Sequence, residues 1–186
     1  MAKHGVCPWW LGYLLASPLR RLSQNPARIL LPYLRPGMTV LEPGPGMGFF
    51  TLDMARMVGA SGRVVAVDVQ PRMIEALKRR ARRAGLLDRI DARIVEAGSM
   101  ALGGLDGSFD FVFACAVVHE VPSAARFFAE AARAMKSGAK LLLAEPAGHV
   151  ENAEFSEQTA AAERSGLRLI ERPPIARCHT ALFEKD

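Results

Sequence analysis

Residues 40–50 of the chain read Val40-Leu41-Glu42-Pro43-Gly44-Pro45-Gly46-Met47-Gly48-Phe49-Phe50. The apolar run at the start predicts a short strand, the three glycines predict a tight turn, and the residues that follow predict the start of a helix. Glycine lets a ligand approach the backbone closely, and the first N–H groups of a helix attract a carboxylate or a phosphate. We therefore predict a ligand-binding loop between a strand and a helix.

A second apolar run, residues 64–67, ends in Asp68, twenty residues after Gly48. In doubly wound α/β folds an acid at this place accepts hydrogen bonds from the hydroxyls of a ribose. The loop and the acid together predict an adenosine-containing ligand at the carboxyl edge of a sheet. A nicotinamide fingerprint would have its third glycine at position 49, where this chain has Phe49, so the spacing disfavours a dinucleotide.

Strand-like and helix-like segments alternate from residue 38 to the end of the chain. The expected strands are residues 38–42, 63–68, 90–96, 109–114, 140–145, 167–172 and 177–184. The expected helices are residues 49–58, 73–84, 124–135 and 152–165. This alternation predicts an α/β fold with a doubly wound, mainly parallel sheet. The last two strands are expected to form an antiparallel hairpin, because only a few residues around Pro173 and Pro174 separate them.

The pattern Glu42-x-Gly44-x-Gly46-x-Gly48 resembles the first motif of class I S-adenosylmethionine-dependent methyltransferases of the small-molecule type, and Asp68 is similar to the acid of their second motif. The likeness continues through residues 109–114 and 135–143, which are similar to the family's fourth strand and to its next helix, turn and strand. The resemblance implies a seven-stranded Rossmann-like methyltransferase fold with a C-terminal antiparallel hairpin. It also implies S-adenosylmethionine as the cofactor.

The resemblance also implies roles for individual residues around the cofactor. The three glycines would pass its methionine part, Glu42 would hold its amino group, and Asp68 would bind its ribose. Val69 and Met73 would line the adenine. After the third strand the family commonly has Gly-Asp-Ala, whereas this chain has Ala97-Gly98-Ser99, so Ser99 or a backbone carbonyl would replace the usual acid. The expected cofactor-binding residues are Glu42, Gly44, Gly46, Gly48, Asp68, Val69, Met73, Gly98, Ser99 and Cys115.

The side of the site that binds the methyl acceptor is expected just past the fourth and fifth strands. His119 is the first choice for a base, because an imidazole titrates near neutral pH, and Glu120 and His149 complete the expected catalytic set. A base is needed only if the acceptor arrives protonated. Structural alternatives stay open, namely a packing or capping role for His119, a solvent-facing or capping Glu120, a capping His149, and Cys115 as a small buried residue.

Composition narrows the class of protein further. The chain has 186 residues, a net charge of +5 and three widely separated cysteines, which favours a cytoplasmic protein without disulfides or a metal site. The basic run at residues 78–83 is expected to be a solvated helix end, so neither nucleic acid nor membrane is an expected partner. The expected function is methyl transfer to a small-molecule acceptor, by a monomer or a homodimer. The alternatives are a non-catalytic sensor that binds the cofactor and a nicotinamide-dependent oxidoreductase.

Residues 1–37 precede the first expected strand and are expected to form a helical cover or lid, and residues 38–186 the S-adenosylmethionine-binding domain. One helix is expected at residues 9–22, broken by Pro18, and a second begins near Asn25 and Pro26. Trp9, Trp10 and Tyr13 would supply apolar surface to the lid. A helix packed on the sheet, a dimer contact and a membrane-surface anchor are the alternatives.

Overall fold

The computed structural model describes residues 20–21 and 23–186. The seven strands are β1 (Thr39–Pro43), β2 (Arg63–Asp68), β3 (Ile90–Ile94), β4 (Phe109–Cys115), β5 (Met135–Pro146), β6 (Leu167–Glu171) and β7 (Cys178–Lys185). The α-helices are α2 (Pro26–Leu30), α3 (Thr51–Val58), α4 (Pro71–Arg83), α5 (Ala124–Ala134) and α6 (Asn152–Arg164), and the short 3-10 helices are η2 (Leu87–Arg89) and η3 (Val118–Glu120).

The strands form one sheet in the order β3-β2-β1-β4-β5-β7-β6. Pairs β1/β2, β2/β3 and β4/β5 are parallel, whereas β7 runs antiparallel to both β5 and β6. The predicted α/β fold, with a mainly parallel sheet and a closing antiparallel hairpin, is confirmed. The chain also divides into two compact units. Among the described residues, the first unit ends at Val95 and the second begins at Glu96.

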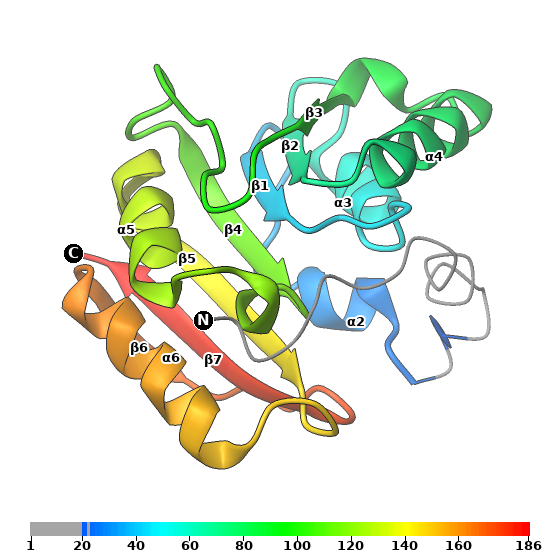
Figure 1. Ribbon diagram of the computed structural model, residues 1–186. Coiled ribbons are helices and arrows are strands. Elements are labelled where there is room, and N and C mark those ends of the chain that lie inside the picture. The colour runs from blue at the N-terminus through cyan, green and yellow to red at the C-terminus, as the bar shows by residue number, and fades with distance from the viewer. Residues whose placement is uncertain (1–19, 22) are drawn as a thin grey trace. The chain divides into compact units, whose positions relative to one another are not determined.

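The first unit contains β1, β2 and β3 with helices α3 and α4 (Figure 1). In β2, Val64–Asp68 is buried, as expected for a parallel strand with both faces covered. Helix α4 buries Met73, Ile74, Ala76, Leu77 and Ala81 on one face and leaves its arginines mostly on the other. The apolar residues that repeat at helical spacing in the sequence are therefore the residues that this helix buries.

The second unit contains β4, β5, β6 and β7, with α5 and α6 side by side (Figure 1). Strand β4 buries Phe109, Phe111 and Phe113, which fill the core of this unit. Helix α5 begins where the Ser123 hydroxyl accepts a hydrogen bond from the Arg126 backbone N–H at 3.3 Å. The carboxyl ends of β4 and β5 lead into the loops that carry the expected catalytic residues.

Most predicted elements lie within a few residues of the observed ones. The largest difference is β5, which begins at Met135 rather than at residue 140. Met135 already pairs with Phe109 of β4, before the chain turns at Gly138. Helix α2 begins as predicted, with the Asn25 side chain accepting from the Ala27 backbone N–H at 3.0 Å. The expected helix at 9–22 and the residues Trp9, Trp10 and Tyr13 lie almost wholly outside the described residues.

Among the described residues, no helix combines the length and the apolar character that a bilayer crossing requires.

Candidate cofactor and acceptor sites

The predicted ligand-binding loop connects β1 to α3 in the first unit. Its three glycines all have positive φ, +67° at Gly44, +53° at Gly46 and +83° at Gly48. The Gly44 backbone N–H donates to the Val67 carbonyl of β2, and the Gly48 N–H donates to the Pro45 carbonyl, both at 2.9 Å. Left-handed backbone at three positions explains the alternating glycines, because side chains with a Cβ disfavour it.

The glycines of this loop differ in what surrounds them. A Cβ on Gly46 would have no non-adjacent atom within 4 Å, so open space lies above this residue. A Cβ on Gly48 would lie 2.3 Å from Leu77 Cδ1 of α4. Gly46 therefore fits the predicted close approach of a ligand, whereas the missing side chain of Gly48 lets α4 pack against the loop. The sequence motif suggested a ligand for both glycines and did not distinguish these two reasons.

Glu42 lies near the end of β1 and is buried, with a side-chain hydrogen bond from the Thr51 hydroxyl to Glu42 Oε2 at 2.5 Å. Burial raises the pKa of this carboxyl to about 8, and the negative charge of Asp68 adds to the rise, although the hydrogen bond from Thr51 and the charge of Arg20 oppose it. The group is therefore largely protonated at neutral pH. A cationic amino group placed beside it would lower its pKa and make it a counter-ion.

Asp68 ends β2 and is nearly buried, with Oδ1 accepting a hydrogen bond from the Gln70 backbone N–H at 2.9 Å. Burial raises its pKa above the usual value, and hydrogen bonds from the backbone N–H groups of Gln70, Gly46 and Val69 limit that rise. The carboxylate is thus held at the same loop as Gly46. It is an acceptor of the kind that two ribose hydroxyls need.

The residues of the first unit fit the predicted cofactor. Glu42 is a buried acid that a cationic amino group would compensate, open space lies above Gly46, and Asp68 is a fixed hydrogen-bond acceptor. Val69 is 37% exposed, which suits an adenine-facing residue. Met73 is buried in a cluster with Met47 and Ala76. Its side chain therefore packs with the loop residue Met47 and leaves little surface for a ligand.

Replacing Asp68 with alanine should weaken S-adenosylmethionine binding by about 1.5–3 kcal/mol, or roughly 10- to 150-fold, because two hydrogen bonds to a charged acceptor are lost. Isothermal titration calorimetry measures this change. The matched control is Asp91→Ala on β3, whose carboxylate pairs with Arg93. Wild-type affinity in the Asp68 variant would mean that the ribose binds elsewhere.

Replacing Glu42 with glutamine should stabilise the ligand-free protein at alkaline pH. The folded pKa of Glu42 is about 8 against 4.5 for a free glutamate, so this group favours the folded state at low pH and loses that contribution as pH rises through 8. Between about pH 6 and about pH 9 the variant should gain about 2–3 kcal/mol in unfolding free energy relative to wild type.

Urea unfolding at both pH values measures this gain, with Glu75→Gln on the exposed face of α4 as the control that should show none. The same Glu42 variant should bind S-adenosylmethionine more weakly than wild type, because the counter-ion for the amino group is gone. Equal pH dependence in the two variants would contradict the assignment of Glu42 as a buried protonated acid.

In the second unit, residues 97–99 are the segment where the sequence resemblance implied a substitute for the family's usual acid. Gly98 has φ of +85°, and the nearest atom to an added Cβ is Pro122 Cγ at 3.8 Å, so the space is adequate but the backbone disfavours a side chain. The Ser99 hydroxyl accepts from the Ala101 backbone N–H at 3.1 Å. Ser99 therefore has a local turn-stabilising role, and its binding of adenine stays a prediction.

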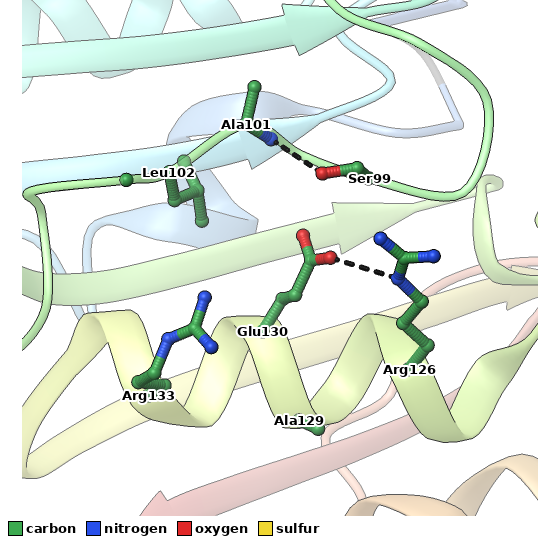
Figure 2. Close-up of a pocket in the computed structure, with 8 residues that line it drawn as sticks. Ser99, Ala101, Leu102, Arg126, Ala129, Glu130 and Arg133 are labelled. Atoms are coloured by element: carbon green, nitrogen blue, oxygen red, sulfur yellow. Dashed lines mark hydrogen bonds and ion pairs between the residues drawn. The ribbon is translucent and has the colours of Figure 1, made fainter.

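A pocket of about 410 Å³ lies between the loop at residues 99–103 and α5 (Figure 2). Glu130 accepts the Arg126 Nε hydrogen bond at 3.2 Å and the Met100 backbone N–H at 2.8 Å. Arg133 Nε pairs with Asp106 at 3.2 Å. Both arginines are thus matched by carboxylates, and the pocket offers no concentrated charge for a ligand.

The expected catalytic residue His119 lies in η3, just past β4, and its side chain is only 7% exposed. Its Nδ1 is hydrogen-bonded to Oε2 of Glu145, a fully buried residue near the end of β5. Burial lowers the pKa of His119, but the hydrogen bond and charge of Glu145, with the charges of Glu120 and Glu154, outweigh it, and the pKa is raised. The imidazole is thus oriented by a carboxylate on a neighbouring strand.

The other expected catalytic residues lie near His119 in the same unit. Glu120 Oε1 is 3.9 Å from His119 Nε2, and the rings of His119 and His149 are 6.5 Å apart between centroids. Helix α6 has Glu151 as its N-cap and no side-chain cap, so the alternative role of His149 as a helix cap is not observed. Cys115 ends β4 and is half-buried, less enclosed than a small core residue.

Sequence reasoning missed two residues that shape these sites, Thr51 and Leu77, and it placed a third, Glu145, near the expected site without giving it a role. Thr51 donates to Glu42, Leu77 occupies the space that a side chain on Gly48 would need, and Glu145 holds His119. Thr51 and Leu77 lie on α3 and α4 and show no distinctive signal in a single sequence. Glu145 did have a signal, because it stands at the end of the fifth strand, at the same sheet edge as His119.

A family model described as a methyltransferase domain matches residues 41–143, more than half of the chain. The ubiquinone/menaquinone biosynthesis C-methyltransferase of Shewanella pealeana is 31% identical over 111 residues, which are 60% of this chain and 43% of that protein. A 37.1 kDa protein of transposon TN4556 from Streptomyces fradiae is 34% identical over 113 residues, 60% of this chain and 31% of that protein. The matched stretch spans less than half the length of these curated relatives.

Solved structures show the same fold. An S-adenosylmethionine-dependent methyltransferase from Aquifex aeolicus superposes with a TM-score of 0.84 at 24% identity, covering 96% of this chain and 98% of that one. An S-adenosylmethionine-dependent O-methyltransferase from Thermotoga maritima gives 0.66 at 16% identity, covering 100% and 68%. With a family model over most of the Rossmann-like core and a loop and acid that fit the cofactor, the chain belongs to the family of class I S-adenosylmethionine-dependent methyltransferases.

Proposed function

We propose that this protein transfers the methyl group of S-adenosylmethionine to a small-molecule acceptor by in-line displacement. The observation that carries the proposal is the pair formed by Asp68 and the open space above Gly46, which suits an adenosine-containing cofactor with a charged amino acid end. The cofactor supplies a methyl group already activated by the positive sulfur. The chain's own residues then have to bind the cofactor, orient the acceptor and exclude water.

In this proposal, Glu42 serves as the counter-ion of the cofactor's amino group and Asp68 accepts the ribose hydroxyls. The loop at residues 44–48 carries the methionine part, and residues 97–99 lie by the adenine. His119 is the group that takes a proton from the acceptor, with Glu120 and His149 beside it. Residues 1–37 form a cover over the acceptor, and residues 38–186 form the methyltransferase domain.

The acceptor class is proposed from the relatives and from the site. The Shewanella pealeana relative is named for C-methylation in ubiquinone and menaquinone biosynthesis, which favours a small-molecule acceptor whose carbon becomes nucleophilic after the acceptor loses a proton. A buried imidazole held by a carboxylate suits that step. We propose a cytoplasmic protein that acts on such an acceptor without a nucleic-acid or membrane partner.

The test incubates the purified protein with methyl-labelled S-adenosylmethionine and a low-molecular-weight metabolite extract, and identifies the labelled product by mass spectrometry. The expected result is one labelled product with S-adenosylhomocysteine formed in equal amount. A protein that binds the cofactor by calorimetry but transfers no label would instead be a sensor, and the proposed activity would be wrong. Failure to bind S-adenosylmethionine would overturn the cofactor site itself.

A further inference from the structure

One residue of the basic run at residues 78–83 differs from the solvated helix end that the sequence suggested. The other basic residues of the run are exposed, namely Lys78, Arg79, Arg82 and Arg83. Arg80 is half-buried, and its Nη1 donates a hydrogen bond to the backbone carbonyl of Met47 at 2.5 Å. Met47 belongs to the loop at residues 44–48, so the run contacts the loop that the methionine part of the cofactor is proposed to pass.

Arg80 lies on the face of α4 that packs against this loop. One turn earlier, Leu77 occupies the space that a side chain on Gly48 would need, and Met73 is buried together with Met47. Positions 73, 77 and 80 have the i, i+4, i+7 spacing of a single helix face. The loop is therefore held by apolar contacts from two turns of α4 and by one charged hydrogen-bond donor from the next turn.

The hydrogen bond from Arg80 fixes one peptide group of the loop. The carbonyl of the Met47–Gly48 peptide accepts from Arg80, and the N–H of the same peptide donates to the Pro45 carbonyl at 2.9 Å. Glycine adopts positive and negative φ with similar ease, so a peptide group next to Gly48 would otherwise rotate at little cost. With both of its ends bonded, this peptide keeps Gly48 at the observed φ of +83°.

The turn that this peptide closes contains the backbone on which the cofactor site depends. The turn spans residues 45–48 and includes Gly46, which has open space above it. The Gly46 N–H also donates to the carboxylate of Asp68, the proposed acceptor for the ribose hydroxyls. Rotation of the Met47–Gly48 peptide would break the turn, and it would displace both the open space and the donor that holds Asp68.

The positive charge of Arg80 strengthens its hydrogen bond to the loop. Arginine stays protonated in proteins, and a charged donor forms a stronger hydrogen bond than a neutral one. Burial and the charge of Arg21 lower the pKa of Arg80, whereas the charge of Asp53 raises it. Asp53 lies on α3 and pairs with Arg21 and Arg56. The guanidinium therefore lies where the loop, the first turn of α3 and the third turn of α4 come together.

We propose that Arg80 is a positioning residue for S-adenosylmethionine, which keeps the turn at residues 45–48 in the conformation that binds the cofactor. It acts through the backbone of the loop and needs no contact of its own with the cofactor. This inference rests on the proposed function, which places the methionine part of the cofactor at this loop. Without the Arg80 donor the turn exchanges between conformations, and a turn that is competent for about a tenth of the time binds about 10-fold more weakly.

The first experiment measures amide hydrogen exchange by NMR in the ligand-free protein. Arg80→Met keeps an apolar stem and removes the donor, and the control Arg79→Met removes the same charge from an exposed residue of the run. Exchange at Gly48 should be at least about 10-fold faster in Arg80→Met and unchanged in Arg79→Met, while Val65 in β2 exchanges as in wild type. Wild-type exchange at Gly48 in Arg80→Met, or equal acceleration at Gly48 and Val65, would overturn the proposal.

The second experiment is calorimetric titration with S-adenosylmethionine. Arg80→Met should bind about 10-fold more weakly than wild type, and Arg79→Met should stay within about twofold of wild type. Arg80→Lys should recover most of the affinity, because an ammonium group can donate to the same carbonyl. Wild-type affinity in Arg80→Met, or an Arg80→Lys variant as weak as Arg80→Met, would contradict the role of the donor.

The third experiment measures initial methyl-transfer rates against S-adenosylmethionine concentration in the metabolite-extract assay. In Arg80→Met the KM for the cofactor should rise about 10-fold while kcat stays within about twofold of wild type, because the bound loop has the same shape. A kcat that falls as far as the affinity would overturn the positioning role. A wild-type protein that does not bind S-adenosylmethionine would overturn the proposed function, whereas a wild type that binds it no better than Arg80→Met would overturn the role of Arg80 alone.

Discussion

Replacing Gly46 with valine is expected to abolish measurable S-adenosylmethionine binding, a loss of at least about 100-fold or roughly 2.7 kcal/mol. The valine side chain would enter the open space above Gly46, where the proposal places the methionine part of the cofactor. It would also disfavour the φ of +53° that aims the loop's N–H groups. Calorimetric titration with S-adenosylmethionine measures the effect directly.

The control for this variant is Gly85→Val, because Gly85 has a similar φ of +66° and also has open space beside its Cβ position. Gly85 lies just after the C-terminal end of α4 and is far in sequence from the loop at residues 44–48. Both variants should lose about 1–3 kcal/mol of stability from backbone strain, but only Gly46→Val should lose the cofactor. Undiminished binding in Gly46→Val would remove the structural basis of the cofactor site.

Replacing His119 with alanine is expected to lower the methyl-transfer rate by about 10²- to 10⁴-fold, the usual contribution of a general base. The cofactor affinity should change by no more than about twofold, or roughly 0.5 kcal/mol, because no cofactor contact is assigned to His119. The wild-type rate should rise with pH through the raised pKa of His119, since only the neutral imidazole accepts a proton. The alanine variant should lose this rising limb.

A second variant separates catalysis from packing at the same position. In His119→Asn the side-chain amide can take over the hydrogen bond of Nδ1 with Glu145, but an amide cannot accept a proton near neutral pH. If His119 acts as the base, the asparagine variant should be about as slow as the alanine variant while unfolding at nearly the wild-type temperature. Recovery of activity by asparagine would assign His119 to structure, through its hydrogen bond with Glu145.

The limits of the sequence appear at particular residues. The class of the fold and most element bounds follow from the spacing of hydrophobic residues, which is a local property of the sequence. For this reason β2 was predicted with its observed ends. The start of β5 at Met135 was missed, because its pairing with Phe109 is a contact between distant segments. The loop was recognised from its glycines, yet the reason for Gly48 depends on Leu77, which lies on another helix.

The sequence by itself determined the α/β class, the loop with its acid twenty residues later, and the cofactor family, because strand, turn, helix and acid follow one another along the chain. Only the tertiary structure decided the protonation of Glu42 and the orientation of His119. The pKa of Glu42 depends on its burial near the end of β1, and the orientation of the His119 imidazole depends on its hydrogen bond with Glu145, which lies 26 residues further on. Such groups acquire their chemical state from neighbours that folding alone brings within hydrogen-bonding distance.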